Sequence, residues 1–277
     1  MQEWIRPPEE DDGWIAPGIT QDDLHPFADL AGVDLADAHL NEVSLTGADL
    51  SGANLAAANL SGANLSRANL SYADLRDTIM TGATLVSATL TGAELTGANL
   101  ANADLTGADL TDAGLSGANL TAAGLNGATL RNADLRQAEL IEASLSHADL
   151  TYAKLDFADL TGARLICARL TGTFLLRATL RDADLTGAEL HQVALGGADL
   201  TGAILRDARL LGVIWARKEA ADSGPGEDDH SDLARYPTVW PAGWETRLLR
   251  RSEPGAPGVY LVMSEDDFGQ ADAPPTS

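Results

Sequence analysis

The stretch Ala48-Asp49-Leu50-Ser51-Gly52 shows the unit A-(D/N)-L-(S/T)-G, on which most of the chain is built. A leucine stands at every fifth residue from Leu30 to Leu210, and the only replacement in this series is Met80, which is also apolar. No residue is inserted or deleted over 37 consecutive units. A repeat of fixed period determines the architecture, so it is interpreted before any local propensity.

A second small residue precedes each leucine by two places, and it is nearly always alanine. The exceptions are all compact: Val33, Val43, Thr78, Thr173 and Val193. Glycine is frequent just before this small residue, which is typical of a tight corner. Examples are Gly47, Gly52, Gly62, Gly92 and Gly97. The unit therefore has two small or apolar inward positions and three outward ones.

A period of five fits neither common secondary structure. In an α-helix, five residues advance a side chain by about 140°, so successive leucines would spread around the helix. In a flat strand, side chains alternate with period two, so the leucines would change faces at every unit. A coil that turns about 90° at each unit keeps every leucine inside, and four units then close a square coil of 20 residues. Such coils stack at about 4.8 Å per step through backbone hydrogen bonds.

The inward positions predict the hydrophobic core of this all-β rod. Burial of one leucine contributes roughly 2 kcal/mol, and each unit depends on its neighbours for that burial. Trp215 takes the leucine position after Leu210, with Val213 before it, and is expected to close the last coil. The representative core residues are Leu50, Leu70, Met80, Leu90, Leu110 and Trp215.

On these residues the chain resembles the pentapeptide-repeat proteins. The repeat covers about two-thirds of the chain, from residue 28 to residue 215. The resemblance implies a right-handed quadrilateral β-helix of about nine coils, roughly 44 Å long at the spacing of neighbouring strands. It implies the function much less directly, because one fold hosts many functions.

The flanking segments are predicted to protect the ends of the rod. Residues 1–27 form an acidic segment and an N-terminal cap, in which Leu24, Phe27 and Trp14 cover the open first coil. A short helix is expected after Thr20, as its N-cap, and a dedicated binding site is the alternative for this segment. Residues 216–233 have the composition of a flexible acidic linker. Residues 234–263 form a capping or dimerisation segment, and residues 264–277 a disordered tail.

The totals restrict the partners. The formal net charge is −23, so nucleic acid and anionic membranes are not expected, whereas a basic protein surface is. The single cysteine, Cys167, allows no disulfide within the chain and is expected at the surface. Residues 1–20 lack the basic and apolar pattern of a signal peptide, and no apolar run reaches 18 residues. The expected location is the cytoplasm.

Acidic residues concentrate in the first half of the rod. Residues 28–130 hold 11 acids and 2 bases, a net charge of −9, whereas residues 131–212 hold 11 acids and 9 bases, a net charge of −2. Grouping the units by 20 places the first-half acids on two adjacent faces. The candidate partner-binding residues are Asp29, Asp34, Asp49, Asp74, Asp77, Glu94, Asp109 and Asp112. The alternative is that these charges only keep an apolar repeat soluble.

Motifs of catalysis, metal binding and cofactor binding are not recognised in the sequence. None of the five histidines has a second ligand at metal spacing. No G-x-S-x-G elbow is present, and no glycine motif is followed by the Lys-Ser/Thr of a phosphate loop. The acids are expected to be exposed, without a pocket that could shift a pKa. We therefore expect neither an enzyme nor a cofactor.

Two functions are compatible with an acidic rod. The resemblance implies mimicry of DNA towards DNA gyrase or topoisomerase IV, with protection from topoisomerase poisons. B-DNA carries one charge per about 1.7 Å, hence about 14 charges over the length of five coils, against −9 in residues 28–130. The alternative is a general interaction scaffold with another partner. The resemblance also implies a homodimer through the C-terminal end.

Overall fold

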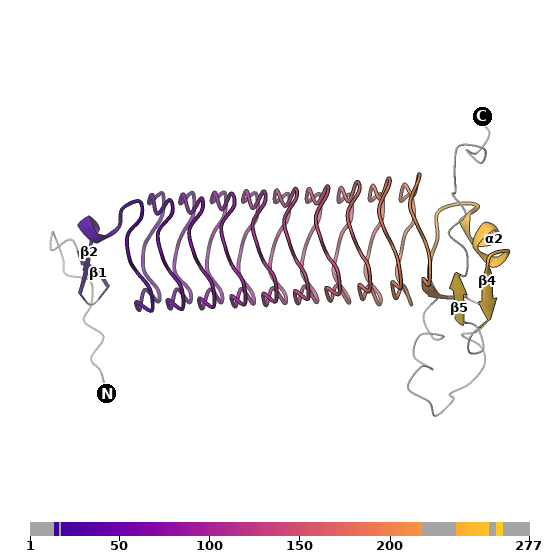
Figure 1. The fold of residues 1–277 in the computed structure, drawn as a ribbon, viewed down its shortest axis with the longest axis horizontal. Coiled ribbons are helices and arrows are strands. Elements are labelled where there is room, and N and C mark those ends of the chain that lie inside the picture. Colours follow the sequence, from indigo (N-terminus) through magenta and orange to yellow (C-terminus); the bar gives the residue numbers. More distant parts are fainter. Residues whose placement is uncertain (1–13, 17, 218–236, 255–258, 263–277) are drawn as a thin grey trace, which may run out of the picture.

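The computed structural model describes residues 14–16, 18–217, 237–254 and 259–262, which form one elongated rod with a small substructure at each end (Figure 1). The acidic segment expected over 1–13, the linker over 218–233 and the tail over 264–277 lie outside the described residues, as does the side chain of Trp14.

Each coil of the rod takes 20 residues, as the period of five predicts. From Asp29 to Ala194, the outward residue of each unit forms a parallel bridge with the residue 20 positions later, for example Asp29 with Asp49 and Asp34 with Asn54. The backbone N–H of Leu30 donates to the carbonyl of Asp49 at 2.7 Å, and the N–H of Asp49 donates to the carbonyl of Ala28 at 2.9 Å. Backbone polar groups of one coil are thus satisfied by the next coil, as buried strands require.

The corners from residue 31 to residue 207 are β-turns. The N–H of Ala48 donates to the carbonyl of Leu45 at 3.0 Å, and Gly47 between them has φ +68°. A positive φ at the second central residue is characteristic of a type II turn, which explains the frequent glycines. Other residue types occupy the same position with the same sign of φ, among them Ala57 and Ala122. Their Cβ is strained in this left-handed conformation.

The core matches the sequence prediction at every representative position. Leu50, Leu70, Met80, Leu90 and Leu110 are completely buried, and Trp215 is 1% exposed. The two threonines at the small position are buried as well. The hydroxyl of Thr78 donates to the carbonyl of Leu75 at 2.7 Å and that of Thr173 to the carbonyl of Leu170 at 2.6 Å, so neither leaves an unpaired polar group in the core.

The N-terminal substructure consists of β1 (Trp14–Ala16), β2 (Ile19–Thr20) and the 3₁₀ helix η1 (Gln21–Asp23). The short helix after Thr20 is confirmed, and Asp23 accepts hydrogen bonds from both the N–H and the hydroxyl of Thr20 at 2.8 Å. Leu24 packs against the core. The expectation for Phe27 was wrong, because it lies at an outward corner and is 77% exposed.

The C-terminal substructure is a three-stranded antiparallel sheet with one helix. Its elements are β3 (Ile214–Ala216), α2 (Trp244–Leu249), β4 (Ser252–Pro254) and β5 (Val259–Val262), with sheet order β3-β5-β4. Trp215 stacks on Tyr260 at a centroid distance of 4.9 Å and meets Trp240 edge-on at 5.9 Å. The all-β expectation therefore describes the rod but not this end, where α2 is added.

The pentapeptide register resumes beyond residue 236. Val239 forms the parallel bridge with Asp199 that the period assigns to residue 219, and its carbonyl accepts the N–H of Leu200 at 2.7 Å. Thr238 and Trp240 occupy the two inward positions on either side and are buried. The interruption before this unit is 20 residues long, which hid the unit in the sequence.

A charge in the core tests the inward assignment. Leu110→Asp places a carboxylate in a fully buried position, and we expect a loss of several kcal/mol in the free energy of unfolding, because the charge finds no partner there. Thr129→Asp on an outward position is the control. Thermal melting followed by circular dichroism measures both, and an unchanged melting temperature for Leu110→Asp contradicts the assignment.

The corner geometry is tested by two glycines of the same coil. A Cβ on Gly117 meets no atom within 4 Å, but φ is +65°, so Gly117→Ala should cost about 1 kcal/mol. Gly124 stands at an outward position without a positive φ, and its Cβ would make ordinary contacts beginning at 3.4 Å. Gly124→Ala should therefore leave chemical denaturation nearly unchanged. Equal losses for the two variants would mean that left-handed strain does not govern the corners.

Candidate protein interface

The register of the coils brings the N-terminal acids together. We call face 1 the outward column that begins at residue 29 and face 2 the column that begins at residue 34, each continuing every 20 residues. Corner 1 lies between them and begins at residue 32, and corner 2 follows face 2 and begins at residue 37. The bridges Asp29–Asp49 and Asp74–Glu94 show that these acids are neighbours along their columns.

Most of the charge of the first five coils lies on these two faces and on corners 1 and 2. We call the acids of these faces and corners the acidic belt. Its members are Asp29, Asp34, Asp37, Asp49, Asp74, Asp77, Glu94, Asp109 and Asp112. Arg76 is the only base among them, so nine acids and one base give a net charge of −8. The belt includes all eight acids predicted from the sequence, and Asp37 joins them at corner 2.

Several carboxylates also build the turns. Oδ1 of Asp49 accepts the N–H of Ser51 at 3.0 Å, and Oδ1 of Asp109 accepts both the N–H and the hydroxyl of Thr111, at 3.0 and 2.6 Å. Asn69 and Ser71 repeat the same contact. These are Asx turns, in which a short side chain satisfies a backbone donor two residues on. This role was not predicted from the sequence, although the fixed D/N-x-(S/T) spacing carries the signal.

The belt acids differ in how far their charge is compensated. Oδ1 of Asp74 accepts a hydrogen bond from Nε of Arg76 at 2.8 Å. The hydrogen bonds from Arg76 hold the pKa of Asp74 below its usual value. Asp34 and Asp112 accept amide donors of Asn54 and Asn132 at 2.8 and 2.9 Å, which leaves their charge in place. Asp77 and Glu94 are exposed. Both lack an ion pair with any described residue.

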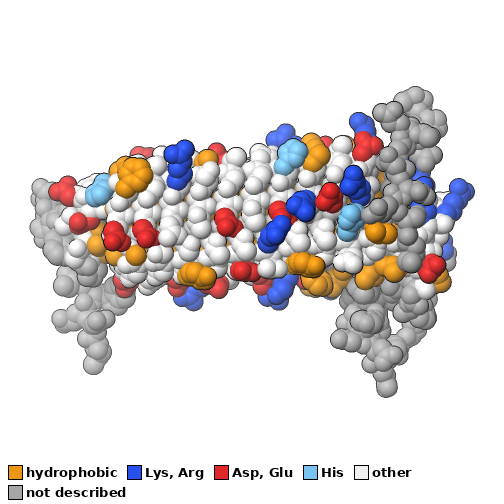
Figure 2. Space-filling model, in the orientation of Figure 1, with side chains coloured by type: hydrophobic (Ala, Val, Ile, Leu, Met, Phe, Trp, Pro, Cys, Tyr) orange, Lys and Arg blue, Asp and Glu red, His pale blue; other side chains and the backbone are white. Residues whose placement is uncertain are grey.

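The C-terminal half of the rod neutralises its own charge. Nε of Arg131 lies 2.7 Å from Asp149 in the next coil. Glu189 lies between Arg169 and Arg209, at 3.7 and 3.8 Å. Toward the N-terminal end of the face in Figure 2, acidic side chains predominate, whereas red and blue side chains mix toward the C-terminal end. Uncompensated negative charge is therefore concentrated in the belt.

An exposed tyrosine lies within the belt. Tyr72 on corner 1 is 73% exposed, and its ring covers Gly92 of the next coil so closely that a Cβ there would be 2.6 Å from the ring. Exposed tyrosine held by its own scaffold is a common anchor of protein interfaces. The belt thus combines charge with an aromatic contact point.

Comparison with known proteins identifies the repeat. The family described as pentapeptide repeats matches in 8 copies, across residues 28–67, 58–97, 88–127, 98–137, 128–165, 163–202 and 183–214. The chain belongs to the pentapeptide-repeat family. The fold of the family is a right-handed β-helix, as the resemblance implied. No curated protein matches the chain.

Solved pentapeptide-repeat proteins are among the similar structures. HetL from the cyanobacterium Nostoc, involved in heterocyst differentiation, is 38% identical over 66% of this chain and 89% of its own, with a TM-score of 0.28. QnrB1, a plasmid-mediated fluoroquinolone resistance protein, is 24% identical over 65% of this chain and 90% of its own, with a TM-score of 0.48. A protein of the Arabidopsis thaliana thylakoid lumen is 34% identical over 37% and 68%, with a TM-score of 0.33.

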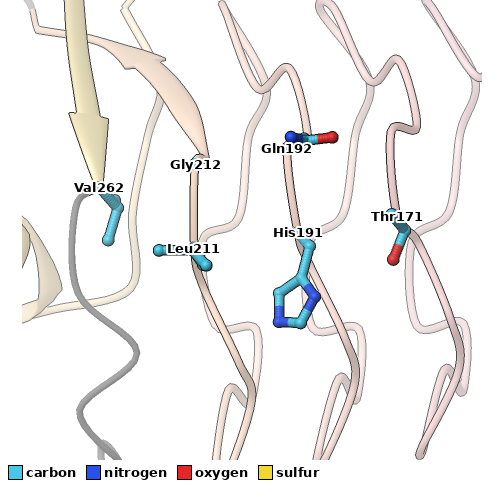
Figure 3. A pocket seen from close by; sticks show the side chains of 6 residues that line it. All are labelled: Thr171, His191, Gln192, Leu211, Gly212 and Val262. Carbon is cyan, nitrogen blue, oxygen red and sulfur yellow. The ribbon is translucent and has the colours of Figure 1, made fainter.

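This pentapeptide-repeat protein also has a pocket, which the sequence analysis did not expect. Its volume is about 460 Å³, and it lies where β5 meets the last coils (Figure 3). The lining residues are Thr171, His191, Gln192, Leu211, Gly212 and Val262. Among the described residues that line the pocket, His191 is the only ionisable one. The pocket arises because the C-terminal segment adds a wall that the repeat alone does not provide.

Among the described residues of the repeat protein, no group of three His, Cys, Asp or Glu side chains is close enough to hold a metal ion. The described helices are also too short to cross a membrane.

The turn-building carboxylates predict a dependence of stability on pH. Hydrogen bonds from the following serine or arginine hold the pKa of Asp49, Asp74 and Asp134 below the usual value. At Asp149 and Asp199 burial acts to raise the pKa, but hydrogen bonds from a threonine and an arginine outweigh it, so the pKa is lowered there as well. A lowered pKa in the folded state stabilises the fold above the unfolded pKa, and that contribution is lost as the pH falls through the folded value. The melting temperature should therefore be flat between about pH 7 and 5 and fall below about pH 4.

A variant with all five residues changed to asparagine keeps one side-chain oxygen at each position, as the acceptor of the turn N–H, and removes the titration. Its melting temperature should depend less steeply on acid than that of the unmodified protein. Asp156 acts in the opposite direction, because burial raises its pKa, so it is left unchanged in both proteins. If the melting temperatures of the two proteins fell equally steeply as the pH is lowered, this explanation would be contradicted.

Proposed function

We propose that this protein is a non-enzymatic acidic rod that acts in the cytoplasm by binding a partner protein through the acidic belt. The most specific candidate partner is a type II topoisomerase, DNA gyrase or topoisomerase IV. The observation that supports this is the net charge of −8 on two adjacent faces and their corners in the first five coils, beside a C-terminal half that cancels its own charge. A partner of this belt needs a basic surface, and the DNA-binding surface of a topoisomerase is one.

Charge density limits the mimicry to one half of the rod. Five coils span about 24 Å, over which B-DNA carries about 14 charges. The belt provides somewhat more than half of this negative charge on two sides of the rod, whereas the following coils provide almost none. The proposal is therefore partial mimicry, in which the N-terminal half enters the site of the duplex and the C-terminal half remains outside it.

A general scaffold function is the second candidate, and the turn contacts favour it. Because Asp49 and Asp109 are hydrogen-bonded within their own turns, the fold needs an acceptor at these positions whatever the partner is. Asparagine serves the same purpose at Asn69. Some of the aspartates are then present because the turn needs a hydrogen-bond acceptor. Only the acidic residues that are not needed as acceptors are evidence for a basic partner.

The ends of the rod are assigned within the same proposal. Residues 14–24 and 237–262 are proposed to cap the stack, because Leu24 and Val262 pack against the core at opposite ends. Capping prevents the open edges of the first and last coils from pairing with other chains.

The test is a supercoiling assay with purified gyrase, with and without a quinolone, in which this protein is titrated. The drug arm is included because QnrB1 is described as a fluoroquinolone resistance protein. Inhibition or rescue is expected at micromolar concentration and should weaken steeply with salt, as contacts between charged surfaces do. No effect at tens of micromolar would contradict the topoisomerase proposal, and the general scaffold function would then be the remaining candidate.

Charge-removing variants locate the interaction. Asp34→Asn, Asp77→Asn and Glu94→Gln together remove three belt charges, and we expect at least a tenfold loss of potency. Asparagine at residue 34 keeps the side-chain oxygen that accepts the N–H of Ala36 at 3.3 Å. The matched control removes three acids outside the belt, through Glu139→Gln, Glu142→Gln and Asp182→Asn. Equal losses in the two triple variants would mean that net charge, and not the belt, determines binding.

A further inference from the structure

Face 2 changes its chemistry along the rod. Its outward residues form one continuous column of parallel bridges, from residue 34 to residue 214. In order along the rod they are Asp34, Asn54, Asp74, Glu94, Gly114, Asp134, Lys154, Phe174, Ala194 and Ile214. The column thus begins acidic and ends with a lysine and three apolar residues.

Corner 2, which borders this face, changes in the same direction. Asp37 and Asp77 occupy its first coils, whereas Phe157 and Arg177 occupy the later ones. The guanidinium of Arg177 lies 5.0 Å from the ring centroid of Phe157, which presents a cation on top of an aromatic ring. Phe157 and Phe174 are 51% and 45% exposed, and Leu176 between them is partly exposed. From residue 34 to residue 117, face 2, corner 2 and the residues between them hold five acids and Arg76, a net charge of −4. From residue 134 to residue 197 the same surface holds Asp134 and Asp156 against three bases, a net charge of +1, together with its apolar residues.

We infer that a second copy of this chain docks on face 2 with the two rods antiparallel. A two-fold axis that crosses the rod midway between Gly114 and Asp134 reverses the order of the evenly spaced coils. It places Glu94 of one copy opposite Lys154 of the other. On corner 2 the same operation places Asp77 opposite Arg177 and Gly97 opposite Phe157. Each contact occurs twice in the dimer, because a two-fold interface is isologous.

Charge complementarity selects this arrangement over a parallel one. In a parallel pair each residue of face 2 lies against its own copy, so Glu94 meets Glu94 and Lys154 meets Lys154. Like charges across an interface are strongly unfavourable. In the antiparallel pair Glu94 meets Lys154 and Asp77 meets Arg177, two attractive pairs in each half of the interface. The same axis places Asp74 opposite Phe174, and the exposed aromatic rings at residues 157 and 174 are removed from water. Ring burial contributes most of the affinity at such surfaces, while charge pairs fix the register.

The inference goes beyond the proposed function and adds a form of regulation to it. The dimer covers the belt acids of face 2 but leaves those of face 1, Asp29, Asp49 and Asp109, in solvent. A basic partner therefore competes with the second copy for Asp34, Asp74 and Glu94.

The test is sedimentation equilibrium of the full chain at about 0.15 M salt, where repulsion between two acidic rods is screened beyond about 8 Å. We expect a reversible dimer at micromolar concentration. Lys154→Glu should weaken it at least tenfold, and Glu94→Lys should do the same. The double variant Glu94→Lys with Lys154→Glu exchanges the charges of both pairs and should restore the dimer. Arg164→Glu, ten residues after Lys154 and hence on the opposite face of the rod, is the control and should change nothing.

Failure of the charge exchange to restore the dimer would overturn the inference, as would a monomer at all concentrations. Circular dichroism of each variant checks that the rod remains folded. Small-angle scattering separates the proposed dimer, which is nearly as long as one rod, from an end-to-end dimer through the C-terminal substructure, which is twice as long and also contradicts the inference. Because gyrase is not part of this experiment, the dimer and the topoisomerase proposal fail independently.

Discussion

The hydrogen bonds between successive coils are the constraint on which the rest of this protein depends. The N–H of Leu30 donates to the carbonyl of Asp49, and the N–H of Asp49 donates to the carbonyl of Ala28. This pattern repeats along the rod. It holds only if every coil has the same length, because one inserted residue would move the leucines out of the core. The unbroken period of five is therefore a condition of the fold, and it also determines which surface residues become neighbours.

This constraint joins structure and function in the same side chains. The outward Asp or Asn of each unit accepts hydrogen bonds from the following turn, as Asp109 and Asn69 both do. Either residue satisfies the turn, so the choice between them is free to determine charge. The first half of the rod carries aspartate on faces 1 and 2 with little compensation, and the second half places arginine one coil away, as in Arg131–Asp149. The electrostatic potential of the surface therefore depends on whether aspartate or asparagine occupies each outward position, while the backbone of the rod stays the same.

The sequence predicts the rod and its faces well because both follow from the five-residue period and the 20-residue coil that it implies. Leu50, Met80 and Trp215 are buried as expected, and the belt acids lie in the predicted columns. Three features escaped prediction for physical reasons. Phe27 looks like a capping residue but falls at a corner whose positive φ directs its ring outward. Val239 continues the stack after a 20-residue interruption that conceals the period. The pocket forms between the rod and β5, elements whose contact no local pattern encodes.

The most direct test of the central claim, the 20-residue coil, is a distance between two nitroxide labels on one face. Asn59→Cys and Asp159→Cys, with Cys167→Ser to remove the native thiol, place the labels five coils apart. Double electron–electron resonance should give a narrow distribution near 24 Å, at about 4.8 Å per coil. A coil of three units would instead separate the same residues by about 32 Å and turn them to different sides. A centre at that longer distance, or a broad distribution, would contradict the register, and with it the acidic belt and the face proposed for the second copy.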